Sequence, residues 1–71
     1  MLGNNKEKTM TPELYNLCET LGLTVERSIN WTWILGFTSK EAAEEFLLHP
    51  HVYEHRGIHL EQDGTYSAGI R

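Results

Sequence analysis

The sequence predicts an α+β fold: a two-layer domain with a four-stranded, mainly antiparallel sheet and two helices on one face. Two observations lead to this prediction. Residues 11–21 and 41–48 carry apolar side chains at helical spacing. Each of these segments is followed by two short stretches rich in β-branched or aromatic residues, separated by turn residues. The predicted order is therefore helix, hairpin, helix, hairpin (αββαββ).

The first predicted helix begins at Thr11-Pro12-Glu13. Threonine is a preferred N-cap, proline suits the first helical position, and glutamate faces the positive end of the helix dipole. Gly22 ends the helix as a left-handed cap, and Leu23 is the apolar residue that accompanies such a cap. Spacing of i, i+3, i+4 and i+7 predicts a buried stripe of Leu14, Leu17, Cys18 and Leu21. Cys18 is therefore interpreted as a small buried hydrophobe.

The first predicted hairpin covers residues 23–37 (LTVERSINWTWILGF). A three-residue loop, Ser28-Ile29-Asn30, with Asn30 in the left-handed region would set Val25 opposite Trp33. One face would then carry Leu23, Val25, Trp31, Trp33, Leu35 and Phe37, and the other Thr24, Glu26, Thr32 and Ile34. This register predicts that Trp33 is a core residue. It also predicts that Trp31 lies beside the turn, beneath the Arg27 guanidinium in a cation–π pair.

The second predicted helix follows Thr38-Ser39-Lys40-Glu41, which is typical of a capping box with Thr38 as the cap and Glu41 reaching back. Its predicted buried stripe is Ala42, Ala43, Phe46 and Leu47. Pro50 ends the helix, because proline and the residue before it both disfavour helical continuation. A further short helical turn is expected over residues 51–55.

The second predicted hairpin covers residues 58–70 (IHLEQDGTYSAGI), in which Asp63-Gly64 is a strong turn signal. A two-residue loop would set Leu60 opposite Ser67. A three-residue loop over residues 62–64, with a glycine bulge, is favoured because it pairs apolar residues: Leu60 with Tyr66 and Ile58 with Ala68.

Chain length predicts one domain over residues 11–71, preceded by a polar, flexible lead-in over residues 1–10. A domain of this size hides only about 60% of the surface of its unfolded chain, so a staple or a partner often stabilises it. Cys18 is the only cysteine, and an intrachain disulfide is therefore excluded. Because the domain is small and has no disulfide to stabilise it, we expect self-association into a homodimer.

Composition argues against several functions. The formal charge is −4 with histidine neutral, and the six Lys and Arg residues are scattered, so nucleic acid is not an expected partner. No apolar run reaches the 18 to 20 residues of a membrane span, and we expect a cytoplasmic chain without membrane contact. No phosphate-binding glycine loop and no set of nucleophile, base and oxyanion donors is found. The chain is therefore predicted to be no enzyme, with no catalytic residues and no cofactor.

All four histidines lie within residues 49–59 (HPHVYEHRGIH). If residues 51–55 were helical, His51 and His55 would share one face, and His59 could add a third ligand for a metal. Zinc needs a fourth ligand, or a water at a catalytic site, and the sequence offers no clear fourth. A pH-dependent interface and a polar connection between helix and strand are the other interpretations. The polar connection is preferred, and no metal is assigned.

Residues 36–52 (GFTSKEAAEEFLLHPHV), about a quarter of the chain, resemble the strand–helix segment of the dimeric α+β-barrel families. These include stress-responsive barrel domains and small antibiotic-biosynthesis-type monooxygenases. The resemblance implies a small dimer with a ligand or catalytic site lined by His51, His55 and His59. The chain departs from these families because it lacks a strand before its first helix and ends in a hairpin. The same segment is also similar to part of RNA-recognition motifs, without their basic charge and aromatic motifs.

The leading hypothesis is a small, acidic, non-enzymatic module that binds a protein, either a different one or a second copy of itself. The predicted contact residues are Arg27, Trp31, Tyr53 and His55, because tryptophan, tyrosine and arginine are common interface anchors. By analogy, such stand-alone acidic proteins are often regulators or inhibitors, for example phage-encoded ones. Two alternatives stay open: a ligand-binding protein or enzyme of the dimeric α+β-barrel kind, and a zinc-binding module that uses the same histidines.

Overall fold

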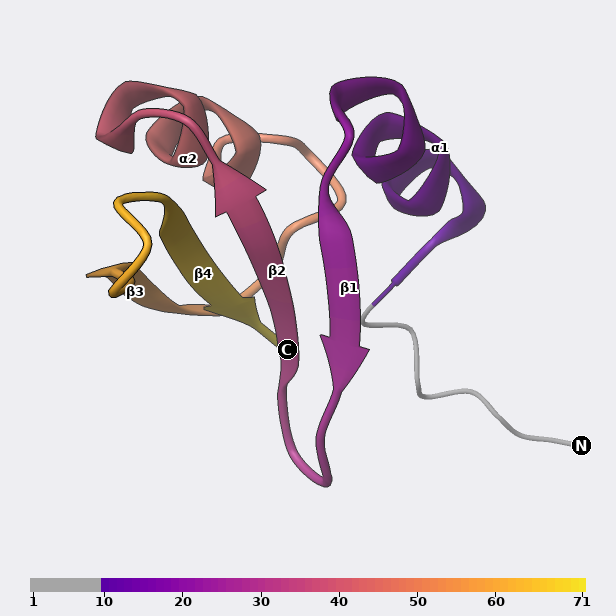
Figure 1. Cartoon of the computed structure of the whole chain (residues 1–71). Helices are drawn as coiled ribbons and strands as arrows, with labels where there is room; N and C mark the ends of the chain where they lie inside the picture. The colour runs from indigo at the N-terminus through magenta and orange to yellow at the C-terminus, as the bar shows by residue number, and fades with distance from the viewer. Residues whose placement is uncertain (1–9) are drawn as a thin grey trace, which may run out of the picture.

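The computed structural model describes residues 10–71, which form two helices and four strands (Figure 1). In chain order these are α1 (Pro12–Leu21), β1 (Thr24–Arg27), β2 (Thr32–Phe37), α2 (Lys40–Leu47), β3 (His55–Leu60) and β4 (Tyr66–Ile70). The predicted α+β class and αββαββ order are therefore observed. Apart from Met10, which packs against the core, the lead-in predicted over residues 1–10 lies outside the described residues. Neither helix has the length and apolar character needed to cross a membrane.

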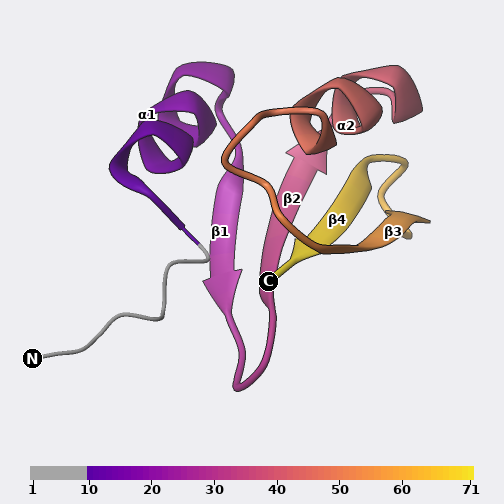
Figure 2. The ribbon, with the colours of Figure 1, turned by 180° about the vertical axis from the view of Figure 1, so that it is seen from behind.

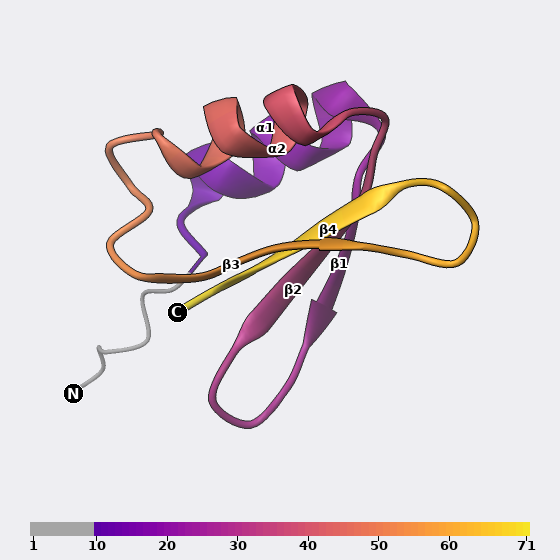
Figure 3. The same ribbon diagram turned by 90° about the vertical axis from the view of Figure 1, so that its left-hand side faces the viewer.

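The four strands form one sheet in the order β1-β2-β4-β3, and every neighbouring pair is antiparallel. Each hairpin therefore supplies one edge strand and one central strand. Both helices lie on the same side of this sheet, as the view along the sheet shows (Figure 3). The connection from α2 to β3 passes beside the start of α1 (Figure 2), where His51 Nδ1 lies 2.8 Å from Thr11 Oγ1.

The core lies between the helices and the sheet. Its fully buried apolar residues are Leu14 and Cys18 from α1, Ala43 and Phe46 from α2, and Ile34, Phe37, Ala68 and Ile70 from the central strands. The rings of Phe37 and Phe46 meet edge to face with centroids 5.5 Å apart, a favoured aromatic geometry. Cys18 is buried as predicted, and desolvation raises the pKa of its thiol. Leu21, predicted to share the stripe of Cys18, is instead 54% exposed at the end of α1.

The caps of α1 agree with the prediction, and the cap of α2 differs by one residue. Thr11 Oγ1 accepts a hydrogen bond from the Leu14 N–H at 3.3 Å, and Gly22 adopts φ 73° at the C-terminus. The N-cap of α2 is Ser39, whose hydroxyl accepts from the Ala42 N–H at 3.1 Å, so the predicted Thr38 cap is wrong. Both residues suit an N-cap. Ser39 has the extended backbone of an N-cap, with φ −150° and ψ 159°, and α2 begins directly after it at Lys40.

The register predicted for the first hairpin is wrong by one residue. Val25 pairs with Ile34 and Arg27 with Thr32, while the Ser28 N–H donates to the Trp31 carbonyl at 2.8 Å. The loop is therefore two residues long rather than three. A shift of one residue exchanges the two faces of a strand. Ile34 is consequently fully buried under the helices, and Trp33 lies on the other face of the sheet, outside the core.

A β-bulge at Gly36 explains this error. Leu35 pairs with Ser67 and Phe37 pairs with Tyr66, so Gly36, with φ 102°, is the extra residue in β2. The bulge turns Phe37 into the core, although simple alternation would place it on the face of Trp33 and Leu35. Grouping Phe37 with the two tryptophans therefore favoured the wrong face.

The second hairpin has the predicted register. Leu60 pairs with Tyr66 and Ile58 with Ala68, and the Glu61 N–H donates to the Thr65 carbonyl at 2.8 Å. Gly64, with φ 89°, takes the left-handed position of the three-residue loop. The Asp63 carboxylate accepts from both the hydroxyl and the N–H of Thr65, and these bonds lower the pKa of Asp63.

Candidate functional site

The sheet face opposite the helices is called the open face here. Alternation along the paired strands places on it Thr24 and Glu26 from β1, Trp31, Trp33 and Leu35 on or next to β2, His59 and Glu61 on or next to β3, and Ser67 and Gly69 from β4. Among residues 10–71, no helix lies over this face (Figure 3). The described helices therefore leave this face of the sheet uncovered.

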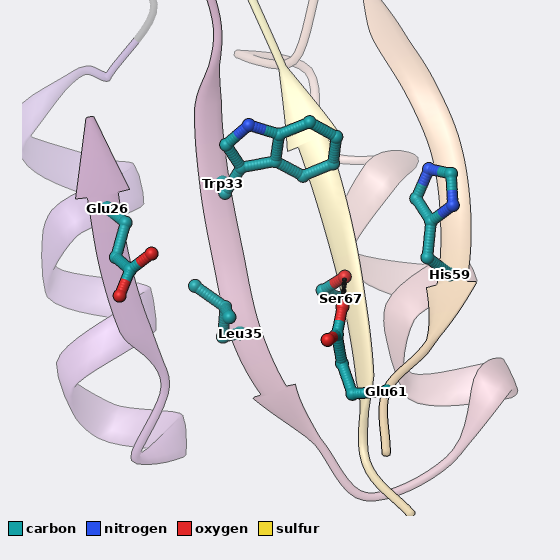
Figure 4. Close-up of a pocket in the computed structure, with 6 residues that line it drawn as sticks. All are labelled: Glu26, Trp33, Leu35, His59, Glu61 and Ser67. Carbon is teal, nitrogen blue, oxygen red and sulfur yellow. Dashed lines mark hydrogen bonds between the residues drawn. The ribbon is translucent and has the colours of Figure 1, made fainter. Parts of the chain in front are cut away.

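The centre of the open face is built around the Trp33 indole. Trp33 pairs with Gly69, and a Cβ built on Gly69 would lie only 2.8 Å from the indole Cζ3. The ring therefore rests directly on the backbone of β4, a position that only glycine at 69 permits. The His59 ring meets the indole edge to face with centroids 5.7 Å apart. Figure 4 shows the indole reaching from β2 across β4 toward His59.

A shallow hollow of about 360 Å³ lies beside this indole. The residues that line it are Glu26, Trp33, Leu35, His59, Glu61 and Ser67 (Figure 4). The buried Ser67 hydroxyl donates to Glu61 Oε2 at 2.6 Å, which holds the carboxylate against the sheet. In a nucleophilic triad the imidazole receives the serine proton and the carboxylate orients the imidazole. Here the hydroxyl bonds directly to the carboxylate, so Ser67, His59 and Glu61 do not form that relay.

Trp31 lies at one end of the open face and contacts two guanidinium groups. The Cζ of Arg56 lies 5.1 Å from the centroid of the Trp31 ring, and the Cζ of Arg71 lies 5.3 Å from it. Both distances fit cation–π contacts, which hold the indole in place. The predicted partner of Trp31 was Arg27, and that pairing is wrong because Arg27 lies opposite Thr32. Sequence reasoning missed Arg56 and Arg71 because the neighbourhood of β2 and β4 brings them to Trp31 from distant positions.

The predicted contact residues lie in different parts of the molecule. Trp31 is on the open face, and Arg27 is exposed at the end of β1. Tyr53 is 76% exposed in the connection between α2 and β3, and His55 begins β3 opposite Ile70. The structure therefore does not gather the four residues into one patch. Trp33, Leu35 and His59 join Trp31 on the open face instead.

The histidines divide into two pairs. No helical turn forms over residues 51–55, because the chain becomes extended after a single turn in which the Val52 N–H donates to the His49 carbonyl. His51 donates its N–H to His49 Nδ1 at 3.0 Å, and its own Nδ1 lies 3.6 Å from Glu13 Oε1. His55 and His59 both lie on β3. Within residues 10–71, no three His, Cys, Asp or Glu side chains come close enough together to hold a metal ion.

Opposite charges lie at the two ends of the open face. Arg56 and Arg71 lie at the same end of the open face as Trp31, because both contact its ring and their neighbours His55 and Ile70 pair with each other there. Glu61 marks the other end, where it pairs with Thr65 next to the loop of the second hairpin. The exposed guanidinium groups and the Glu61 carboxylate are therefore separated along the strand direction, with the apolar centre between them.

Comparison of the chain with protein-family models, curated proteins and solved structures finds no match. The open face is therefore interpreted from its own geometry.

Proposed function

We propose that this chain is a non-enzymatic protein-binding module and that the open face is its binding surface. One observation carries the proposal: Trp31, Trp33 and Leu35 lie side by side on a sheet face over which no helix of residues 10–71 packs. All three residues are partly buried, so part of each apolar side chain remains in contact with water. Apolar patches rimmed by polar residues are typical of protein interaction sites, and tryptophan is the residue most enriched at their energetic centres.

Preorganisation of the aromatic side chains supports this proposal. The backbone at Gly69 and the ring of His59 hold the Trp33 indole, and Arg56 and Arg71 hold the Trp31 indole. Side chains that are already fixed lose little conformational entropy when a partner docks. The charged groups lie around the apolar centre, which matches the usual arrangement of an apolar interface centre with a polar rim.

The other candidate functions have less support. A zinc module, or a ligand site of the dimeric α+β-barrel kind, would need His51, His55 and His59 to act together. His51 instead contacts Thr11 at the start of α1, whereas His59 contacts Trp33 on the open face. We further propose that the chain is cytoplasmic and acts as a regulator or inhibitor by covering a surface of its partner.

Site-specific photo-crosslinking tests the proposed binding surface. A benzophenone amino acid replaces Thr24, which is exposed on the open face, or Glu44, which is exposed on α2 and serves as the control. Irradiation in extracts of the cells that naturally make the chain should give a discrete protein adduct from position 24 only. Trp33→Ala in the same chain should abolish that adduct. Equal adducts from both positions, or none from position 24, would contradict the proposal.

A further inference from the structure

We propose that the partner of the open face is a second copy of this chain, docked face to face about a two-fold axis. The axis lies parallel to the sheet and runs across the strands. This inference rests on the proposed function, because it names the partner of the same surface. Three features of the open face support it: the separation of charge along the strands, the match of side chains in successive rows, and the small size of the domain.

Charge selects the direction of the axis. A homodimer with two-fold symmetry brings the same patch of both copies together, so the patch must complement itself. An axis along the strands would lay β3 of each copy over β1 of the other, with the arginine ends of both copies at one end of the interface and the Glu61 ends at the other. An axis across the strands reverses the second copy, so that each arginine end lies on a glutamate end. Only this second arrangement gives attraction at both ends of the interface.

Side chains in the middle of the open face fit the same axis. The paired strands define one row across the sheet with Glu26, Trp33, Gly69 and Gly57, and the next row has Thr24, Leu35, Ser67 and His59. An axis between these rows places the Trp33 indole against Leu35 of the second copy. It also places His59 opposite the glycine of the first row on β3, where no side chain stands in the way. Large groups therefore meet smaller ones throughout.

The size of the domain favours such a dimer and sets its expected strength. Two sheets packed face to face lie about 10 Å apart and would give this small chain a second apolar layer. Four strands spaced about 4.8 Å apart make a face only roughly 15 Å wide. Standard interfaces bury about 800 Å² on each partner. A face this narrow buries less than that, so we expect a weak dimer with a dissociation constant on the order of 10–100 µM.

Charge reversal with mixing tests the arrangement. Sedimentation velocity between about 5 µM and 1 mM, a range that brackets the expected affinity, measures the dimer fraction of the wild-type chain, Arg56→Glu and Glu61→Arg. Each variant alone would place like charges together at both ends, so its dimer should weaken at least tenfold. In an equimolar mixture, Glu at position 56 of one variant faces Arg at position 61 of the other, and the unchanged Arg56 and Glu61 meet at the opposite end. The mixture should regain dimer with the contact affinity of the wild type, at a lower dimer fraction for the same total concentration because only mixed pairs can form.

Two reversals on α2 provide matched controls. Lys40→Glu and Glu44→Arg cause the same changes in formal charge at exposed helix positions. They should leave the dimer fraction unchanged. Controls that weaken the dimer as much as Arg56→Glu and Glu61→Arg would overturn the proposal. A wild-type chain that stays monomeric up to 1 mM, or a mixture that stays monomeric, would also overturn it.

Crosslinking gives a second measurement in case Glu61→Arg, which loses the Ser67 hydrogen bond, fails to fold. Thr24→Cys and Glu26→Cys lie on neighbouring rows of β1, and the proposed axis sets each opposite the other in the second copy. A short bismaleimide should join the mixed pair faster than either variant joins itself, with the buried Cys18 unreactive. Equal rates in all three samples would overturn the proposed axis.

Failure of this inference can be distinguished from failure of the proposed function. If the purified chain stays monomeric while position 24 still crosslinks to a different protein, the second-copy partner is wrong and the binding surface stands. If the chain stays monomeric and position 24 crosslinks to nothing, both proposals are wrong. An adduct of twice the chain mass from position 24, together with the restored dimer in the mixture, supports both.

Discussion

The two faces of the sheet are made by the same four strands and differ in almost every chemical respect. The face toward the helices carries the buried apolar core residues of the sheet, among them Ile34, Ala68 and Ile70, all with 0% exposure. The open face carries tryptophan, histidine and charged side chains that are only partly covered. One face therefore packs in the core and stabilises the fold, whereas the other is suited to contact with a partner. Neighbouring residues of one strand can consequently have unrelated roles, and substitutions at neighbouring positions can test this division.

The largest effect on the free energy of unfolding is expected for Ile34→Ala, and Trp33→Ala on the other face is its comparison. Ile34 is fully buried, so its truncation should lower the free energy of unfolding by about 2–5 kcal/mol. Trp33 loses a larger side chain from a partly exposed site, and we expect about 1 kcal/mol there, together with loss of the dimer. Urea unfolding at about 2 µM, below the expected dimer dissociation constant, excludes a contribution from association. Equal losses of stability, or a larger loss for Trp33→Ala, would show that the two faces do not divide these roles.

A smaller effect is expected at Gly36, which separates the faces within β2. At φ 102° a side chain is strained, although a Cβ there would meet no atom closer than 3.8 Å. Gly36→Ala should therefore lower the free energy of unfolding by about 1–2 kcal/mol through backbone strain alone. Gly22→Ala, at φ 73° in open space, is the matched control for the same kind of strain outside the sheet.

The outcome at Phe37 sharpens this test. If the bulge sets the orientation of Phe37, Gly36→Ala should also weaken the contact between Phe37 and Phe46, whereas Gly22→Ala should not. Aromatic ring-current shifts of the Phe46 protons measure that contact. Unchanged shifts in a folded Gly36→Ala variant would show that Phe37 keeps its place without the glycine.

The bulge also marks the limit of what the sequence could predict. Helix α1, its two caps and the second hairpin follow from local signals: Thr11-Pro12, Gly22 and Asp63-Gly64 each act within a few residues. The register of the first hairpin depends on Gly36, whose role appears only when β4 pairs with β2 across it. Alternation from Trp31 to Phe37 was unbroken in the sequence, and the local signal for the extra residue was Gly36 itself, since a glycine inside a strand often marks a bulge.

The site was harder to predict than the fold for a related reason. The sequence drew attention to Trp31, but the residues that contact it, Arg56 and Arg71, come from β3 and from the residue after β4. Their approach depends on the strand order β1-β2-β4-β3, which hairpin signals do not specify. The one available signal was Gly69, a glycine inside a strand, which often marks the close approach of another group. Here that group is the Trp33 indole.

The smallest expected effect concerns Asp63, in the loop that brings Glu61 to the rim of the open face. Hydrogen bonds from Thr65 lower the pKa of Asp63 in the folded state below its ordinary value of 3.8. The charged form therefore stabilises the fold at pH values above that ordinary pKa. This stabilisation is lost as the pH falls through the lowered pKa, because the unfolded chain binds the proton more readily. Asp63→Asn can still accept both hydrogen bonds through its amide oxygen but cannot titrate.

Thermal unfolding of the wild type and Asp63→Asn between pH 2 and 7 measures this contribution. The wild type should be the more stable of the two above about pH 4, and the difference should shrink toward zero as the pH falls below that value. Because the group is fully exposed to solvent, we expect a change much smaller than those at Ile34 and Gly36. Asp63→Asn should also leave the dimer fraction unchanged, because the loop would keep its three-residue form and the open face its register. A loss of dimer without a loss of stability would show that the loop itself belongs to the interface, and would extend the open face beyond Glu61.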